Sequence, residues 1–360
     1  MPLTPLRKKR RNKTINNNIK TLEFRIMKKL FIAMMAMAAF AACSNEEPVA
    51  SLQGDAIAFG DAFVDNAVRA IYGENGHNLT AIKVWGNVKQ TNTNNTPVAL
   101  YGTEGATVSG GAYGALWSCN VVRYWTPSCD FNFLAIAHGT VATNDVVNGI
   151  PTKISYTANG DDLLLATPVV ATTDNSGAPI TGVTTVQSEK VVAFTMNHLL
   201  SRIAFKFANN AGNADYKYNV TGIKVYGTYT SGVYTITPGQ GETEGWGSQA
   251  GSLAEGNALT FNAITGLAFG ATTAAEGAYV IIPGDPKLTI TFNTEVVFNG
   301  AVIGTTPHTI TLNQTPEDTD KTFAPNTSYT FTVELPKPGA EIKFSVSEVS
   351  GFGNQEATIQ

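Results

Sequence analysis

Few side chains in this sequence could take part in chemistry, and their spacing matches no catalytic or metal-binding motif. The chain has four histidines, and none lies in an HExxH or HxH pattern. Neither a GxSxG nucleophile motif nor a phosphate-binding P-loop occurs. A GxGxxA match at Gly245, Gly247 and Ala250 lacks the surrounding strand and helix that a dinucleotide site needs. We therefore expect no catalytic residues, no metal site and no cofactor, and the sequence favours a protein that is not an enzyme.

Cys43, the first of three cysteines, follows a segment with the pattern of an export signal. Met27 is followed by two lysines and then by the apolar run 30–42, which has the length of a signal-peptide core and is too short to span a bilayer. Small residues precede Cys43, as in a lipobox, although Phe40 stands where leucine is common. We expect residues 1–42 to be a signal region with its true start at Met27, and Cys43 to be lipidated. Ordinary secretion with cleavage nearby is the alternative.

The four residues after Cys43 are Ser-Asn-Glu-Glu, which resembles the surface-export signal of Bacteroidales lipoproteins. This resemblance implies that the protein lies on the outer face of the outer membrane, anchored to its lipid through Cys43. The basic run Arg7–Arg11 is upstream of the export signal, which would remove it.

Cys119 and Cys129 are ten residues apart, a spacing that fits no zinc site. Beyond the inner membrane a disulfide is permitted, and a hairpin turning near Arg123 could bring the two thiols together. Two buried thiols are an equally good interpretation.

The charge of the exported part excludes a nucleic-acid partner. Residues 1–42 carry ten of the 24 basic residues and one of the 28 acidic residues, so the rest of the chain has a net charge near −13. Phosphate neutralisation needs clustered lysine and arginine, and the exported part has no such cluster.

The sequence pattern predicts that short strands separated by turns position these side chains. Most runs alternate apolar and polar residues, as expected of a strand with one buried face. A polar, turn-rich segment at 171–188 predicts a linker. We expect an all-β chain with two β-sandwich domains in tandem, at about 51–185 and 186–340. The predicted strands lie at 56–59, 80–88, 131–137, 191–196, 201–208, 219–227, 278–283, 287–292, 308–312, 328–335 and 341–349.

Four stretches, in their order along the chain, carry a resemblance to the fimbrillin family of Bacteroidales pilus subunits. The lipoprotein leader precedes a short strand and an arginine in AIAFGDAFVDNAVRA. A W…W-P…F block follows, then FTMNHLLSRIAFKF with a histidine and an arginine, then the ordered C-terminal segments AYVIIPGDPKLTITF, FAPNTSYTFTVELP and EIKFSVSEVSGF. At the end, Phe352 stands where many relatives have tryptophan. The residues that match the family's motifs in the second and third stretches are Trp117, Trp125, Pro127, Phe133, His198 and Arg202.

The resemblance implies two transthyretin-like β-sandwich domains that assemble by strand exchange with other copies or related pilus subunits. It also implies that an Arg-specific protease cleaves between Arg69 and Ala70. That cut would remove residues 43–69, taking away the lipid anchor and the strand around Ile57 and Phe59. An ordinary surface arginine is the alternative.

The donor in such an exchange is expected to be the C-terminal segment 341–360. Its side chains Ile342, Phe344 and Val346 point to one face of the strand. Two prolines precede it and would permit a flexible exit. The alternative is that this segment is the last strand of its own domain.

We therefore expect a fimbrial subunit of the cell surface that supports adhesion. A monomeric surface lipoprotein that binds glycans or host proteins is the alternative, and a host ligand would then be its partner. Trp246, in a Gly-rich segment, is the candidate for an exposed binding residue. His198 is expected to be a hydrogen-bonded residue at a domain boundary and not a metal ligand.

Overall fold

The computed structural model describes residues 55–64, 79–110, 115–237, 239, 242–284, 287–312 and 323–350. All of them belong to one compact unit, Leu52–Gln360. The predicted leader, Cys43 and the Arg69–Ala70 bond lie outside the described residues. No helix in the described ranges is long and apolar enough to cross a membrane.

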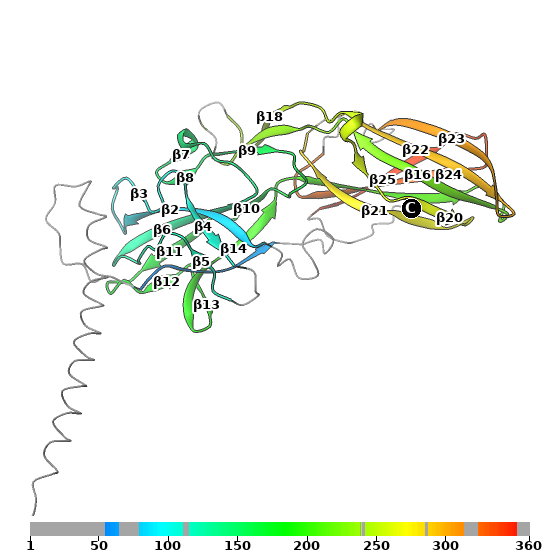
Figure 1. The fold of residues 1–360 in the computed structure, drawn as a ribbon. Coiled ribbons are helices and arrows are strands. Elements are labelled where there is room, and N and C mark those ends of the chain that lie inside the picture. The colour runs from blue at the N-terminus through cyan, green and yellow to red at the C-terminus, as the bar shows by residue number, and fades with distance from the viewer. Residues whose placement is uncertain are drawn as a thin grey trace, which may run out of the picture. The chain divides into compact units, whose positions relative to one another are not determined.

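The regular secondary structure of the described residues is almost entirely β, which confirms the predicted fold class (Figure 1). Strand β22 (Leu288–Phe298) shows why, because its side chains alternate between buried and half-buried along nearly its whole length. This period-two pattern places one face of the strand in a core. Two 3-10 helices of three residues each, η1 (Thr143–Asp145) and η2 (Glu255–Asn257), interrupt the strands.

The first sheet has eleven strands, and its main path runs β1-β14-β10-β6-β2-β4-β5. One face packs on a core rich in aromatic rings, in which Trp125 lies against Phe131 and Phe133. The strands are β1 (Ala58–Val64), β2 (Ala81–Gln90), β3 (Val98–Ala99), β4 (Ala106–Ser109), β5 (Ser118–Cys119), β6 (Cys129–Ala137), β10 (Leu164–Ala166), β11 (Val169–Thr173), β12 (Pro179–Thr181), β13 (Thr184–Val186) and β14 (Glu189–His198).

A second core lies between two further sheets, of four and five strands. Phe205 and Phe331 come from the four-stranded sheet, and Phe292 comes from the five-stranded sheet. The four-stranded sheet contains β21 (Thr272–Ile281), β15 (Ser201–Asn210), β24 (Thr327–Pro336) and β25 (Lys343–Ser350). The five-stranded sheet contains β19 (Leu259–Thr260), β20 (Ile264–Leu267), β16 (Tyr216–Tyr226), β22 and β23 (Ala301–Leu312).

A third hydrophobic cluster joins side chains from both halves of the chain, including Trp85, Ile154, Leu200 and Tyr234. Ile154 and Tyr234 come from the three-stranded sheet β18-β17-β9, in which β9 of the first half pairs with β17 of the second, whereas Trp85 comes from β2 of the first sheet. The remaining strands are β7 (Val146–Val147), β8 (Ile150–Pro151), β9 (Lys153–Thr157), β17 (Ser231–Thr235) and β18 (Gly245–Ala250).

The pairing of β14 bears on how the chain is divided. It begins at Glu189, after the predicted boundary at 185/186, yet it pairs with β1, β10 and β13 of the first sheet. The first core accordingly extends to Met196, and the second begins with Ile203. The exact domain limits stay a prediction.

Candidate functional site

Strand β1 is hydrogen-bonded along both of its edges. On one edge it pairs in parallel with β14, where Ala58 lies opposite Val191 and Phe59 opposite Val192. On the other edge the Ile57 amide donates to the carbonyl of Arg123 at 2.8 Å. The Trp117 amide donates to the Phe59 carbonyl at 3.0 Å, and the Trp125 amide donates to the Asp55 carbonyl at the same distance.

These bonds make β1 the strand that closes the first sheet. The path of the sheet begins at β1 and ends at β5, and Trp117, the neighbour of β5 in sequence, bridges back to Phe59. Residues 55–59 thus lie between β14 and the segment 117–125. Without them, both neighbours would have a row of unpaired backbone donors and acceptors.

The apolar side chains of this segment are buried in the first core. Ile57 is 5% exposed and Phe59 is fully buried. The Phe59 ring lies 6.2 Å from the Phe133 ring in an edge-on arrangement and 6.1 Å from the Phe194 ring in a stacked one. Burial of each such side chain contributes about 1.5–3 kcal/mol. The alternation Ile-Ala-Phe in the sequence produces this by placing every second side chain in the core.

Gly60 directly follows Phe59, and the side chains of Val191 and Val186 approach it closely. A Cβ atom at this position would lie 2.8 Å from the Cγ2 methyl of Val191 and 3.4 Å from that of Val186. A strand in this place therefore needs a small residue here. We call the space that residues 55–60 occupy between β14 and the segment 117–125 the β1 groove.

In the sequence, the predicted anchor precedes β1 and the predicted cleavage site follows it. Arg69 and Ala70 lie outside the described residues, as does Cys43. All of β1 is N-terminal to Arg69 in the sequence. The predicted cut would therefore separate this deeply buried strand from the rest of the chain.

The predicted donor segment has a partner in its own chain. Strand β25 pairs antiparallel with β24, with Phe344 opposite Val333 in register and Val346 opposite Phe331. Ile342 and Val346 are half-buried and pack against the second core. The structure thus shows the arrangement that the sequence left open as the alternative, a last strand within its own sheet.

Both described cysteines are free thiols in the structure. Cys119 is half-buried and donates to the Val121 carbonyl at 3.1 Å, whereas Cys129 is buried and donates to the Pro127 carbonyl at 3.3 Å. Burial raises the pKa of each thiol. A raised pKa lowers the fraction of reactive thiolate, which suits a packing role.

His198 Nδ1 and Asp162 Oδ2 form a hydrogen bond that is almost completely shielded from water, because both side chains are buried. Its two residues come from the end of β14 and the loop before β10. Burial raises the pKa of Asp162, while the hydrogen bond with His198 opposes this rise. The sequence indicated a hydrogen-bonded His198, but its partner was not visible because it lies 36 positions away.

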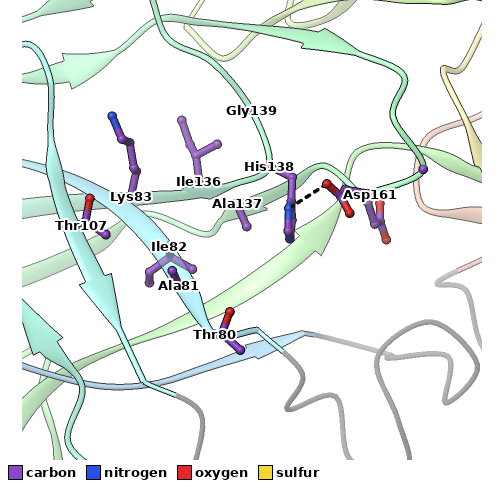
Figure 2. Close-up of a pocket in the computed structure, with 12 residues that line it drawn as sticks. Thr80, Ala81, Ile82, Lys83, Thr107, Ile136, Ala137, His138, Gly139 and Asp161 are labelled. Atoms are coloured by element: carbon purple, nitrogen blue, oxygen red, sulfur yellow. Dashed lines mark ion pairs between the residues drawn. The ribbon is translucent and has the colours of Figure 1, made fainter.

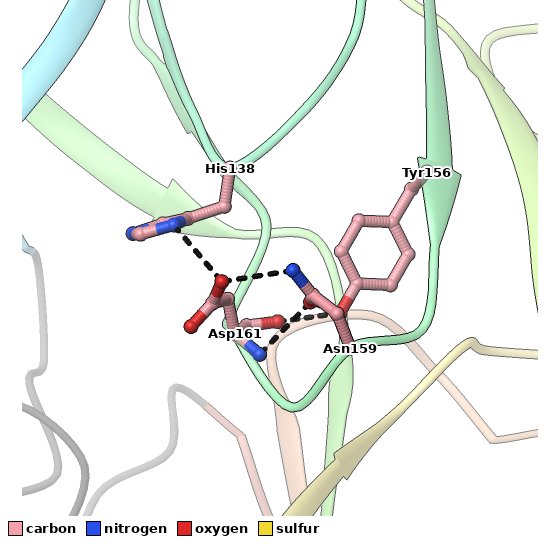
Figure 3. A network of polar contacts seen from close by, with 4 residues as sticks. All are labelled: His138, Tyr156, Asn159 and Asp161. Carbon is pink, nitrogen blue, oxygen red and sulfur yellow. Dashed lines mark hydrogen bonds and ion pairs between the residues drawn. The ribbon is translucent and has the colours of Figure 1, made fainter.

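A second histidine–aspartate contact lies at the surface next to this pair. His138 Nδ1 is 3.6 Å from Asp161 Oδ2. Figure 3 shows that Asn159 and Tyr156 hold the same loop, with the Asn159 amide donating to Asp161 Oδ2 at 2.8 Å. His138 and Asp161 line one side of a hollow of about 640 Å³, with Lys83 and Thr107 on the other side (Figure 2). Within the described ranges, no three metal-ligating side chains gather in one place.

Trp246 is a packing residue, so the prediction of an exposed binding tryptophan is wrong. It lies on β18, where it is half-buried and its indole Nε1 donates to the Leu199 carbonyl at 2.6 Å. The Tyr156 and Tyr234 rings meet it edge-on. The Gly-rich composition suggested a loop, but the segment pairs with β17.

Comparison with known proteins gives one family match and several structural neighbours. The model of a family described as fimbrillin-like matches residues 69–350, which is more than half of the chain. A fimbrial protein from Bacteroides vulgatus has 14% identity and a TM-score of 0.50, over 81% of this chain and 99% of that one. No curated protein matches the sequence.

Two further solved structures are similar in part. A candidate cell adhesion protein from Bacteroides uniformis has 13% identity and a TM-score of 0.45, over 82% of this chain and 99% of that one. The tip fimbrial protein Mfa3 from Porphyromonas gingivalis has 10% identity and a TM-score of 0.32, over 82% of this chain and 100% of that one.

Proposed function

The chain belongs to the fimbrillin-like family, and on this premise we propose that it is exported as a lipoprotein, trimmed after Arg69 and joined to other subunits by strand exchange. The family match supports a role as a fimbrial subunit in adhesion at the cell surface. The observation that carries the rest is the position of β1, which closes the first sheet although it precedes Arg69 in the sequence.

Cleavage by an Arg-specific protease at Arg69 would release residues 43–69, and with them the lipid on Cys43. It would also allow β1 to leave the sheet. The family match begins at residue 69, which agrees with a conserved unit that starts near this point. One proteolytic step would thus free the subunit from the outer membrane and expose the β1 groove.

The exposed groove is suited to receive a strand from another subunit. An added strand gains backbone hydrogen bonds along both edges and buries apolar side chains in the places of Ile57 and Phe59. The two burials together contribute about 3–6 kcal/mol, before the backbone bonds are counted. The proposed donor is segment 341–360 of a second copy or of a related pilus subunit.

One observation favours a second candidate, a monomeric lipoprotein that binds glycans or host proteins at the surface. Strand β25 is paired with β24 of its own chain. If that pairing persists after export, the chain has no strand to donate. The hollow beside His138 would then be a candidate contact for a ligand.

The mature N-terminus distinguishes the two functions. Mass spectrometry of the protein isolated from cells should find Ala70 as the first residue, and electron microscopy should find fibres that are absent without this protein. A mature form that begins at lipidated Cys43 would favour the tethered monomer. A variant lacking residues 340–360 should be a folded monomer that cannot polymerise, and fibres formed by it would rule out the proposed donor.

A further inference from the structure

We propose that the C-terminal segment of a second copy enters the β1 groove in one register, with Ile342 in the place of Ile57 and Phe344 in the place of Phe59. This inference rests on the proposed function, because it needs the groove to be open and the segment to be donated. It adds which residue of the donor meets which part of the groove.

The first support is a repeated pattern within the sequence. Residues 57–64 read IAFGDAFV, and residues 342–349 read IKFSVSEV. Both have isoleucine, phenylalanine and valine at the first, third and eighth positions. Both have a small residue at the fourth and sixth positions. The removed strand and the proposed donor thus share these three apolar side chains at the same spacing, whereas their fifth and seventh positions differ.

The second support is the narrow space around Gly60. In the proposed register, Ser345 takes this place. Its Cβ would lie 2.8 Å from the Val191 methyl unless that side chain moves, and a serine needs a smaller movement than the larger residues of the donor would. A donor displaced by one residue would put Phe344 or Val346 against Val191 and Val186. Such a displacement would also turn the apolar face of the donor away from the core, because side chains alternate along a strand.

The third support is side-chain size, which decides between registers two residues apart. A donor displaced so that Phe344 replaces Ile57 would place Val346 among the rings that surround Phe59. Valine is smaller than the fully buried phenylalanine and would leave a cavity next to Phe133 and Phe194. Displacement in the other direction would put Lys343 at the Gly60 position. The proposed register avoids both the cavity and a lysine at the Gly60 position.

Strand β25 has fewer bonded neighbours and less burial in its observed place beside β24 than β1 has in the β1 groove. In its own chain β25 is bonded to one neighbour, β24, within the described residues, whereas β1 is bonded on both edges. Ile342 is half-buried there, whereas Ile57 in the groove is 5% exposed. A donor that leaves β24 for the groove therefore gains a bonded neighbour on its second edge and buries Ile342 more deeply.

Disulfide trapping in the mature chain 70–360 tests the register. In this register Lys343 lies opposite Val191, because it takes the place of Ala58. With Cys119→Ser and Cys129→Ser as background, the pair Val191→Cys and Lys343→Cys should give a ladder of covalent oligomers on a non-reducing gel. The matched pair Val191→Cys and Ser347→Cys should give at least tenfold less. In this register Ser347 takes the place of Ala62, opposite Phe194, and it reaches Val191 only if the donor is displaced by two residues.

The outcomes separate the register from the function. A ladder from the Ser347 pair, or fibres in the microscope without a ladder from either pair, overturns the register while strand exchange stands. A background chain that never polymerises contradicts the proposed function itself.

If the cysteine variants fail to assemble, a peptide experiment tests the register instead. A peptide of residues 341–350, added to the mature chain without engineered cysteines, should occupy the groove and stop polymer growth. Phe344→Ala in the peptide should abolish this inhibition, because it empties the place of Phe59. Val346→Ala should weaken it less, and the reverse order of the two effects would overturn the proposed register.

Discussion

At the residue scale, Phe59 is the side chain that ties β1 most firmly to the first core. It is fully buried among aromatic rings, and its backbone carbonyl accepts from Trp117. In the untrimmed chain 43–360, Phe59→Ala should lower the free energy of unfolding of the first core by about 3–5 kcal/mol, as for other buried phenylalanines. Urea denaturation measures this change.

The matched control is Val170→Ala, since Val170 lies in the same sheet but is 60% exposed. It should change the free energy of unfolding by less than about 0.5 kcal/mol. Equal effects of the two substitutions would show that β1 is not a stabilising part of the sheet.

The buried carboxyl group of Asp162 gives a prediction about pH. Because burial raises its pKa, the group binds its proton more tightly in the folded chain. Its contribution to stability is therefore complete below the unfolded-state pKa of about 4 and is lost as pH rises through the raised pKa. Relative to the wild type, Asp162→Asn should thus become more stable as pH increases over this interval.

Thermal unfolding at several pH values measures this difference, with the neighbouring Asp161→Asn as control, because that carboxyl is at the surface. An equally large pH dependence in the control would show that the effect does not come from the burial of Asp162. If the advantage of Asp162→Asn shrinks as pH rises, then His198 stabilises the anion more than burial destabilises it.

At the element scale, β23 is a long strand at the edge of its sheet. Its residues 301–307 are exposed on both faces and carry no charge, and Val302 and Ile303 are more than half exposed. Such an edge invites pairing with another chain. Pro307 lies in this stretch opposite Asn293 and has no amide hydrogen to donate to a new partner.

Pro307→Thr should therefore increase self-association without lowering the unfolding temperature by more than a few degrees. Light scattering during incubation at increasing concentration measures the effect, with Thr305→Val as the control for added β-propensity. Unchanged scattering for Pro307→Thr would show that the proline does not protect this edge.

The elements also show what the sequence can and cannot predict. Alternation found the strands β15, β22 and β24, because each has one face in the second core. It found β1 as a short strand, but not its parallel pairing with β14 or its contact with the segment 117–125. Those partners lie far away in the sequence and leave no local pattern.

The candidate site was predictable to a similar extent. The buried pair Ile57 and Phe59 follows from alternation, and the need for a small residue at Gly60 follows only from the approach of Val191 and Val186. Trp246 was misread because glycine-rich composition suggested a loop, whereas its pairing with β17 and its bond to Leu199 depend on tertiary contacts.

At the scale of the whole molecule, the proposed assembly depends on a sheet that is complete in the precursor and opens after the proposed trimming. The same chain provides both a strand that closes the groove before cleavage and a segment of matching pattern that could close it in a neighbour. The lipidated precursor would thus be kept monomeric by its own β1 until the protease acts.

The most direct measurement compares the size of the chain before and after removal of β1. Analytical ultracentrifugation of chains 55–360 and 70–360, at equal concentration, should find a monomer for the longer chain and polymers for the shorter one. Adding an Arg-specific protease to the longer chain should convert it, while Arg69→Ala should prevent the conversion. A chain 70–360 that remains a folded monomer, with no tendency to join its neighbours, would contradict the account.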